Sequence, residues 1–190
     1  MSDAELIQRL INGDEMAFRH LIETYQNLVF KTCFNLLRNK EDAEDLAQDV
    51  FIEIYESINQ FRNESKLSTW LYRIAINKSL NQLRKNKIKS MISSIDHFFV
   101  RDKNSKLEPV DPDSDNNPES IYYNERIHIM QKAIDSLPEN QRIAFTLCKY
   151  EDLSYQEISS VMNLSLSSVE SLIHRAKLSL QKKLINYYKN

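Results

Sequence analysis

Glycine is the residue that most constrains this chain, because Gly13 is the only one among its 190 residues. Phosphate-cradling loops, dinucleotide-binding turns and the nucleophile elbow of hydrolases all need glycines where the backbone turns sharply or approaches a ligand. The sequence therefore argues against those enzyme classes. Because there are also only four prolines, we expect an all-helical chain.

Composition is that of an ordinary globular protein, with 42% hydrophobic and 27% charged residues, and the length fits one large domain or two small ones. No apolar run approaches the roughly 20 residues that cross a bilayer. The N-terminus also lacks the basic-then-apolar order of a signal peptide. We therefore expect no membrane insertion and a cytoplasmic location.

The cysteines and histidines show no metal-ligand spacing. Cys33 and Cys148 stand far apart among apolar neighbours and outside any C-x-x-C pair, which favours buried free thiols over a disulfide or a zinc site. The four histidines are scattered, so satisfied or surface side chains are the default interpretation. We predict no metal site, no cofactor and no catalytic residue.

Helical periodicity dominates the N-terminal half. Helices are expected over residues 3–11 and 15–37, the second with Asp14 as its cap, and a third begins at Asn39 or Lys40. Acids fill the first turns of the third helix, which suits the positive end of the helix dipole. Its apolar residues follow the i, i+3, i+4, i+7 spacing of a core-facing stripe: Leu46, Ala47, Val50, Phe51, Ile54, Tyr55, Ile58 and Phe61.

A fourth helix, capped at Ser68, is predicted within "KLSTWLYRIAINKSLNQLRKNK", residues 66–87. Residues 62–89 carry eight cations against the single acid Glu64, although the whole chain has a net charge of -2. The slight net acidity therefore does not exclude a locally cationic surface that attracts an anionic partner. Polar residues recur every three or four positions and so share one face of this helix. They form a cationic stripe made of Arg73, Asn77, Asn81, Arg84 and Lys85.

The composition changes after residue 100. Residues 101–120 hold three of the four prolines, six acids and almost no large apolar side chain, so burial cannot offset their ordering entropy. For residues 90–100, weak packing and burial under a partner both stay open. We predict an all-α protein in which a bundle of three or four helices, residues 1–95, and a four-helix domain, residues 121–190, are joined by a flexible acidic linker, residues 96–120.

The C-terminal part has the capping and turn residues of a helix-turn-helix. "SLPENQR" places Pro138 at a helix start, with Ser136 three residues before an acid. Ser154 and Glu157 then form a capping box for a short helix, and Asn163 stands where a left-handed turn residue is needed. A second helix begins at Ser165 or Ser167, ends at Lys182 and Lys183, and buries Val169, Leu172, Ile173 and Ala176.

Many tight helix pairs are only structural, but this second helix is also suited to DNA. Its short polar residues can approach a phosphate or a base edge, and the basic ones that follow can contact the backbone. The candidate residues are Ser165, Ser167, Ser168, Glu170, Ser171, His174, Arg175 and Lys177.

The order of these motifs closely resembles the extracytoplasmic-function sigma factors, the small two-domain subunits of bacterial RNA polymerase. The resemblance rests on "DAEDLAQDVFIEIYESINQF", "STWLYRIAINKSLNQLRK", an acidic linker, "LPENQRIAFTL" and the helix-turn-helix, and it covers nearly the whole chain outside the linker. It implies that the first domain grips the polymerase clamp helices and reads and melts the -10 promoter element. The second domain would dock on the -35 element, and an anti-sigma partner would cover these faces.

The resemblance assigns roles to particular residues. "DLAQD" matches the polymerase-binding signature, which implies core-enzyme contacts for Asp45, Gln48 and Asp49, whereas charge alone would indicate a solvated acidic face. An unpaired DNA strand needs cations for its phosphates and groups such as asparagine that both donate and accept for its bases. The implied -10 contacts are Arg62, Asn63, Ser65, Lys66, Arg73, Asn77, Lys78, Asn81, Arg84 and Lys85.

The chain departs from the family pattern at Glu170 and Leu172, where the recognition helix often carries basic residues. Affinity for the upstream element is then weak or differently specified, and Glu170 could accept a hydrogen bond from cytosine. The alternative hypothesis is a stand-alone dimeric helix-turn-helix regulator that reads palindromic half-sites about one helical turn apart without polymerase. An enzyme acting on nucleic acid would need a metal-spaced acid cluster or a nucleophile, and neither is visible.

Overall fold

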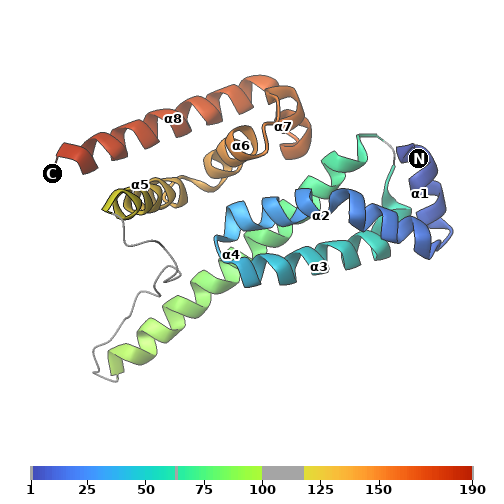
Figure 1. Cartoon of the computed structure of the whole chain (residues 1–190), viewed down its shortest axis with the longest axis horizontal. Coiled ribbons are helices and arrows are strands. Elements are labelled where there is room, and N and C mark those ends of the chain that lie inside the picture. The colour runs from blue at the N-terminus through green and yellow to red at the C-terminus, as the bar shows by residue number, and fades with distance from the viewer. Residues whose placement is uncertain (1, 63, 100–117, 190) are drawn as a thin grey trace.

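The computed structural model describes residues 2–62, 64–99 and 118–189, with side chains over 2–62, 64–89 and 125–187. Within those ranges the chain forms helices and no strand, which confirms the all-α prediction (Figure 1). No helix among them is long and apolar enough to cross a membrane. The helices are α1 (Asp3–Ile11), α2 (Glu15–Leu37), α3 (Lys40–Ser57), the 3-10 turn η1 (Ile58–Gln60), α4 (Leu67–Phe99), α5 (Pro118–Asp135), α6 (Glu139–Tyr150), α7 (Tyr155–Met162) and α8 (Leu166–Lys189).

Local capping signals set the starts of α2 and α3 as predicted. The Asp14 carboxylate accepts hydrogen bonds from the amides of Met16 (2.9 Å) and Ala17 (3.2 Å). The Asn39 side chain accepts from the amide of Asp42 at 3.0 Å. These bonds satisfy amides that have no partner within the first helical turn.

Helices α1 to α4 share the first hydrophobic core. Fully buried side chains come from α2 (Leu21, Val29), α3 (Ile54) and α4 (Leu71). Burying each of them stabilises the fold by about 1.5–3 kcal/mol. The prediction that Tyr55 belongs to this core is wrong: its side chain is 49% exposed, because it lies at the edge of the apolar stripe and packs edge-on against Phe18, which is partly buried.

Helix α4 differs from its predicted boundaries at both ends. It begins at Leu67, so Ser68 lies inside the first turn and is not the cap. The amides of Thr69 and Trp70 donate to the Lys66 carbonyl, and burial of Leu67 in the first core favours this earlier start. At the other end the backbone stays helical through Phe99, beyond the predicted residues 66–87.

The predicted linker, residues 96–120, overlaps helical residues at both edges. It begins within the last turn of α4 and ends within the first turn of α5. The residues between, 100–117, lie outside the described ranges. The division into two domains joined by a linker stays a prediction.

Helices α7 and α8 form the predicted helix-turn-helix. Both bonds of the capping box are present, from the Glu157 amide to the Ser154 hydroxyl (3.3 Å) and from the Ser154 amide to the Glu157 carboxylate (3.1 Å). Asn163 adopts the left-handed conformation with φ 53°. Helix α8, however, continues to Lys189, because Leu180 and Leu184 pack against α5 beyond the point where the charge pattern predicted an end.

The cap predicted before α6 is wrong. Pro138 precedes the helix as expected, but no side chain caps α6. The hydroxyl of Ser136 instead donates to the carbonyl of Ala133 at the end of α5 (2.6 Å). Ser136 therefore serves the helix before it.

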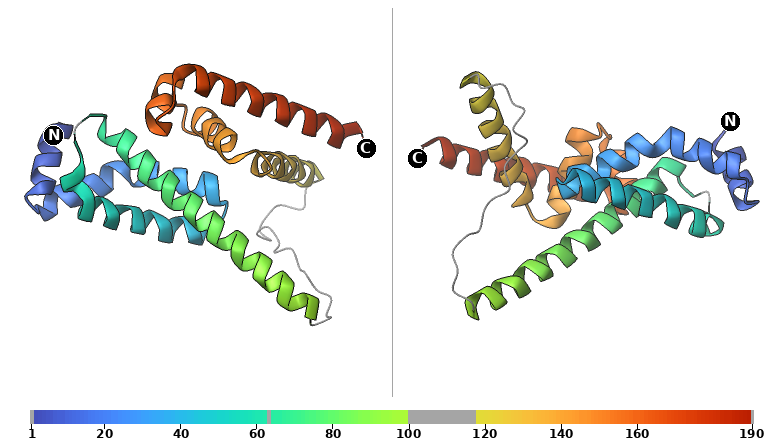
Figure 2. Two further views of the ribbon diagram at one scale, coloured as in Figure 1. Left: turned by 180° about the vertical axis from the view of Figure 1, so that it is seen from behind. Right: turned by 60° about the horizontal axis from the view of Figure 1, so that its bottom comes forward.

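A second hydrophobic cluster joins the two halves of the chain, and Figures 1 and 2 show α6 and α7 lying beside α2 and α4. Helix α4 belongs to both clusters. Leu71 and Ala75 face the first core, whereas Tyr72, Ile76 and Leu80 face the second. The second cluster is completed by Leu36 of α2, Ile143, Ala144 and Leu147 of α6, Ile158 and Val161 of α7, and Val169 and Ile173 of α8.

Candidate polymerase and nucleic-acid interfaces

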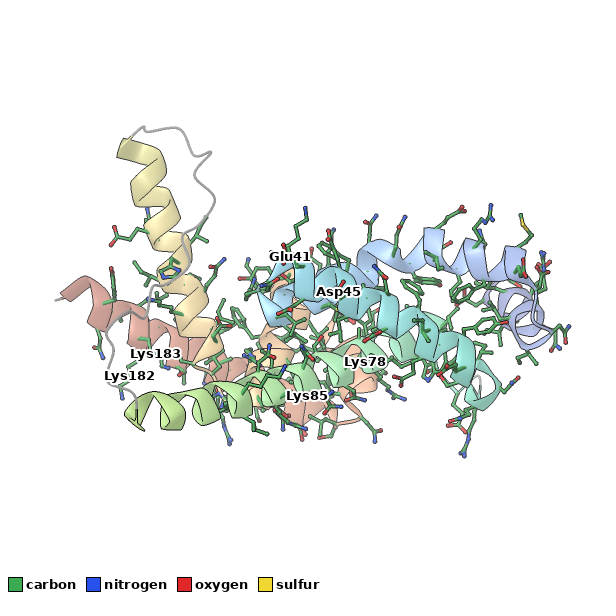
Figure 3. All side chains as sticks on the ribbon, turned by 90° about the horizontal axis from the view of Figure 1, so that it is seen from below. Glu41, Asp45, Lys78, Lys85, Lys182 and Lys183 are labelled. Atoms are coloured by element: carbon green, nitrogen blue, oxygen red, sulfur yellow. The ribbon has the colours of Figure 1, made fainter. Side chains whose placement is uncertain are left out.

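The predicted polymerase-binding residues lie on one face of α3. Asp45, Gln48 and Asp49 are all exposed, and their i, i+3, i+4 spacing places them together on the helix surface. Figure 3 shows Asp45 and Glu41 along this helix. The face therefore presents acids to solvent, as a surface for a basic groove would.

A cavity of about 370 Å³ lies beside this face, between α2 and α3. Gln48 lines it with Ala47 and Phe51 of α3, opposite Ile22 and Phe30 of α2. Its other lining residues are polar: Gln26 and Asn27 of α2 and Glu44 of α3. The cavity extends the acidic face toward α2.

The cationic stripe runs along α4, where Figure 3 shows Lys85 with Lys78 closer to α3. Asn77, Asn81, Arg84 and Lys85 are exposed, and Arg73 is half-buried. None of the stripe is sealed inside the molecule. Lys78 lies outside the stripe and forms an ion pair with Glu53 of α3 (2.9 Å).

The predicted -10 contacts before α4 lie on the segment that leads into the helix. Arg62 and Lys66 are exposed and Ser65 is half-buried. Asn63 lies outside the described residues. Phe61 and Trp70 pack together with ring centroids 5.2 Å apart and contact the first core, as the core interpretation of both predicted.

Three predicted -10 cations contact the C-terminal helices. The Arg73 guanidinium donates to the carbonyl of Ser160 at 2.6 Å and to that of Val161 at 3.3 Å. Two carboxylates pair with the others: Glu139 with Arg84 at 2.8 Å and Glu157 with Lys66 at 3.5 Å. Sequence reasoning missed these partners, and no local pattern encodes pairs separated by 55 and 91 residues.

A cavity of about 760 Å³ opens between the stripe and the C-terminal helices. Ser65, Arg73, Asn77 and Arg84 line it on one side. The opposite wall comes from α6, α7 and the turn after it, through Glu139, Asn140, Val161, Met162 and Asn163.

A polar cluster around Glu151 also lies in the junction, the contact between the helices α2 and α4 and the C-terminal helices. The Glu151 carboxylate accepts a hydrogen bond from the Asn35 amide at 2.9 Å, and Tyr72 lies within hydrogen-bond reach. Burial raises the pKa of the Glu151 carboxyl above its ordinary value, more than the hydrogen bonds and Lys31 lower it. Burial and the nearby carboxylate also raise the pKa of Tyr72. The ionised carboxylate is therefore held there at a cost.

The predicted -35 contacts cluster at the start of α8 and on its outer face. All eight side chains are exposed, while Val169, Ile173 and Ala176 face inward. The Ser165 hydroxyl accepts a hydrogen bond from the Ser168 amide at 3.2 Å and so caps the helix. Leu172, predicted as core, is only half-buried.

The cysteines and the described histidines were the candidates for metal or redox chemistry. Both cysteines are free, Cys33 is buried as predicted, and Cys148 is only partly buried. Burial raises the pKa of the Cys33 thiol to about 11, which makes it unreactive. In the part of the chain that the structure describes, no group of three or more histidine, cysteine or acidic side chains is arranged to hold a metal ion.

The fold and these surfaces define a class: a helical DNA-binding protein with a helix-turn-helix, a cationic stripe and a separate acidic face. Two family models match it, Sigma-70 region 2 over residues 21–88 and Sigma-70, region 4 over residues 127–180. The RNA polymerase sigma-H factor of Pseudomonas aeruginosa is 33% identical over 187 residues, which cover 96% of this chain and 93% of the relative. The ECF RNA polymerase sigma-E factor of Escherichia coli is 32% identical over 187 residues, covering 97% and 95%.

Two solved structures share the fold. CnrH, solved in complex with the cytosolic domain of CnrY, has a TM-score of 0.65 and 20% identity over 97% of both chains. RpoE of Bartonella quintana, solved with the anti-sigma factor NepR, has a TM-score of 0.60 and 22% identity over 88% of this chain and 96% of that one. The chain therefore belongs to the sigma-70 family of RNA polymerase sigma factors, in its extracytoplasmic-function class.

Proposed function

We propose that this chain is a promoter-specificity subunit that binds core RNA polymerase, recognises the -35 and -10 elements and promotes strand opening. One observation carries the proposal. The region 2 match contains both the exposed acids of α3 and the cationic stripe of α4, and the region 4 match contains the helix-turn-helix. Each required surface thus lies in the region of the family expected to supply it.

The work is divided between the two ends of the chain. Residues 1–95 bind polymerase through Asp45, Gln48 and Asp49 and capture the unpaired -10 strand on α4 and the segment before it. Residues 121–190 dock α8 on the -35 element. Binding the unpaired strand and polymerase together lowers the free energy of promoter opening, because a protein that prefers the open state shifts the equilibrium toward it.

The -10 surface suits single-stranded DNA chemically. Arginine and lysine neutralise phosphates without reading sequence, whereas the exposed amides of Asn77 and Asn81 can donate to and accept from base edges. On α8, Glu170 is exposed among the serines of the first turns and can accept from a cytosine amino group.

We propose no catalytic chemistry for this chain. The relatives described above are sigma factors. The proposal also includes an anti-sigma partner that restrains the protein, and a cytoplasmic site of action, where core polymerase works. Both of the solved neighbours described above are in complex with a partner, one named as an anti-sigma factor.

Transcription in vitro tests the proposal. Purified chain and core polymerase are incubated with genomic fragments, and selective start sites are expected only when both are present. A gel-shift assay on a selected fragment should show strong binding with polymerase and little without it. Specific binding of the chain alone to a palindromic site would contradict the proposal and identify a stand-alone regulator.

A further inference from the structure

We infer that the C-terminal helices occupy the -10 face of α4, so that the closed chain inhibits its own DNA binding. This inference rests on the proposed function, because it uses the assignment of α4 to the unpaired strand. It adds an internal competitor for DNA that needs no second protein. Three kinds of contact support it.

The first is ionic. Lys66, Arg73 and Arg84 are the cations that the proposed function assigns to phosphates, and each contacts an oxygen atom of α6 or α7. Glu157 and Glu139 provide carboxylates at 3.5 and 2.8 Å. The protein thus supplies oxygen atoms where a DNA strand would supply phosphate oxygens.

The second is the end of helix α7. Arg73 binds the carbonyls of Ser160 and Val161, which belong to the last turn of this helix. Carbonyls at a helix C-terminus carry partial negative charge and have no partner within the helix. The guanidinium therefore satisfies them, and it is partly withdrawn from solvent by doing so.

The third is apolar. Tyr72, Ile76 and Leu80 of α4 are buried and pack in the second cluster against α6 and α7. Exposed ion pairs are individually weak, so this cluster supplies most of the stability of the closed form and the ion pairs give it its register. Because the ion pairs are weak, phosphates can replace them.

The arrangement has a quantitative consequence. The apparent affinity for DNA equals the intrinsic affinity multiplied by the fraction of open molecules. Loosening the junction therefore raises affinity even when no DNA-contacting residue has changed. Closure is also expected to be incompatible with a strand lying along Arg73 and Arg84, since the same guanidinium groups serve both.

The first test measures binding to a fluorescein-labelled oligothymidylate of about 15 nucleotides, because phosphate contacts are independent of sequence. Glu139→Gln and Glu157→Gln should each raise affinity about twofold to fourfold, and glutamine retains the capping-box acceptor at 157. Glu125→Gln is the charge-matched control: Glu125 accepts from Tyr187 at the far end of α5, and its substitution should have little effect.

A fourth variant separates loosening from a simple gain of positive charge. The Asn35 side chain donates to the Glu151 carboxylate at 2.9 Å, so Asn35→Asp replaces this donor with a second carboxylate that repels Glu151. Neither residue belongs to the DNA surface. The substitution makes the protein more negative, which by itself weakens DNA binding. Closure nevertheless predicts about twofold or greater tightening. The inference would be overturned if Asn35→Asp binds the oligothymidylate more weakly than wild type and if Glu139→Gln and Glu157→Gln change its affinity no more than the control Glu125→Gln does.

A second readout does not depend on affinity. A water-soluble carbodiimide joins a carboxylate to a neighbouring amine as an amide, and Lys66 with Glu157 is a suitable pair at 3.5 Å. Mass spectrometry should find this cross-link in the free chain, absent from Glu157→Gln and lost with excess oligothymidylate. A cross-link that never forms, or that persists when DNA saturates the protein, would contradict closure.

The same experiments distinguish this inference from the proposed function. If Asn81→Ala with Lys85→Ala, which changes two exposed stripe residues outside the three closing contacts, leaves oligothymidylate binding unchanged, the -10 assignment of α4 is wrong and the inference falls with it. If that variant weakens binding while the three loosening variants match wild type, the DNA face stands and only closure is refuted.

Discussion

The side-chain amide of Asn35, in α2, donates a hydrogen bond of 2.9 Å to the carboxylate of Glu151, 116 residues later in the chain. This bond lies in the junction between the two halves, where burial raises the pKa of Glu151. A raised pKa means that the folded state favours the protonated carboxyl. That contribution to stability is complete below the ordinary value near 4.5 and is lost as the pH rises through the raised value.

Glu151→Gln should therefore stabilise the protein at pH 7, because glutamine resembles the protonated acid and still accepts from Asn35. We expect Tm to rise by about 1–3 °C at neutral pH, and the gain should shrink as the pH approaches 4.5. Calorimetry across this range checks it, with Glu125→Gln as the control. A variant that is less stable at pH 7 would show that the charged bond outweighs the cost of burial.

Replacing Arg84 and Lys85 by alanine should weaken open-complex formation and its salt dependence. The slope of log affinity against log salt should fall by about one unit for each phosphate that the protein no longer neutralises. Filter binding or fluorescence with polymerase and a selected promoter provides the measurement. Lys40→Ala is the control for loss of a single cation outside the stripe, because Lys40 is exposed on α3 and pairs only weakly with Glu44 at 3.9 Å. An unchanged slope would remove α4 from the DNA surface.

Replacing Asp45 and Asp49 by alanine should reduce polymerase binding about tenfold or more, since two interface charges that pair with a basic groove are removed together. Both side chains are exposed, so helix content and Tm should stay near wild type. Pull-down or light scattering with core polymerase measures the effect. Glu5→Ala with Glu23→Ala removes two exposed acids from α1 and α2 as the control, and equal loss of binding in both variants would indicate a general charge effect.

Ser154→Ala should destabilise the helix-turn-helix by about 1 kcal/mol, because it removes the hydroxyl that accepts from the Glu157 amide and donates to the Glu157 carboxylate. For a chain of this size that lowers Tm by about 2–4 °C. Ser160→Ala is the control in the same helix: its hydroxyl bonds only within the helix, to the carbonyl of Gln156. Thermal unfolding by circular dichroism should separate the two variants.

Local chemistry was enough to predict the helix starts at Asp14 and Asn39, the capping box at Ser154 and the left-handed turn at Asn163. Each of these depends on neighbours within about four residues. The errors arose where distant packing decides. Burial of Leu67 moves the start of α4, and contacts with α5 extend α8 beyond its predicted end.

The candidate surfaces divide in the same way. Helical spacing was enough to bring Asp45, Gln48 and Asp49 onto one face, and to align the cationic stripe. It could not reveal which groups oppose the stripe, because Glu139, Glu157 and the last carbonyls of α7 reach it only through tertiary packing. From sequence alone, Glu157 is a capping residue with no visible second role.

Helix α4 carries three sets of residues at fixed angles about a single axis: one in each hydrophobic cluster and one in the cationic stripe. Inserting one residue after Tyr72 would turn everything that follows by about 100° and advance it by about 1.5 Å. Ile76 and Leu80 would rotate toward water while Arg84 turned away from its present direction. The number of residues between these side chains is therefore under as much constraint as their identities, and this helix should tolerate substitutions far better than insertions or deletions.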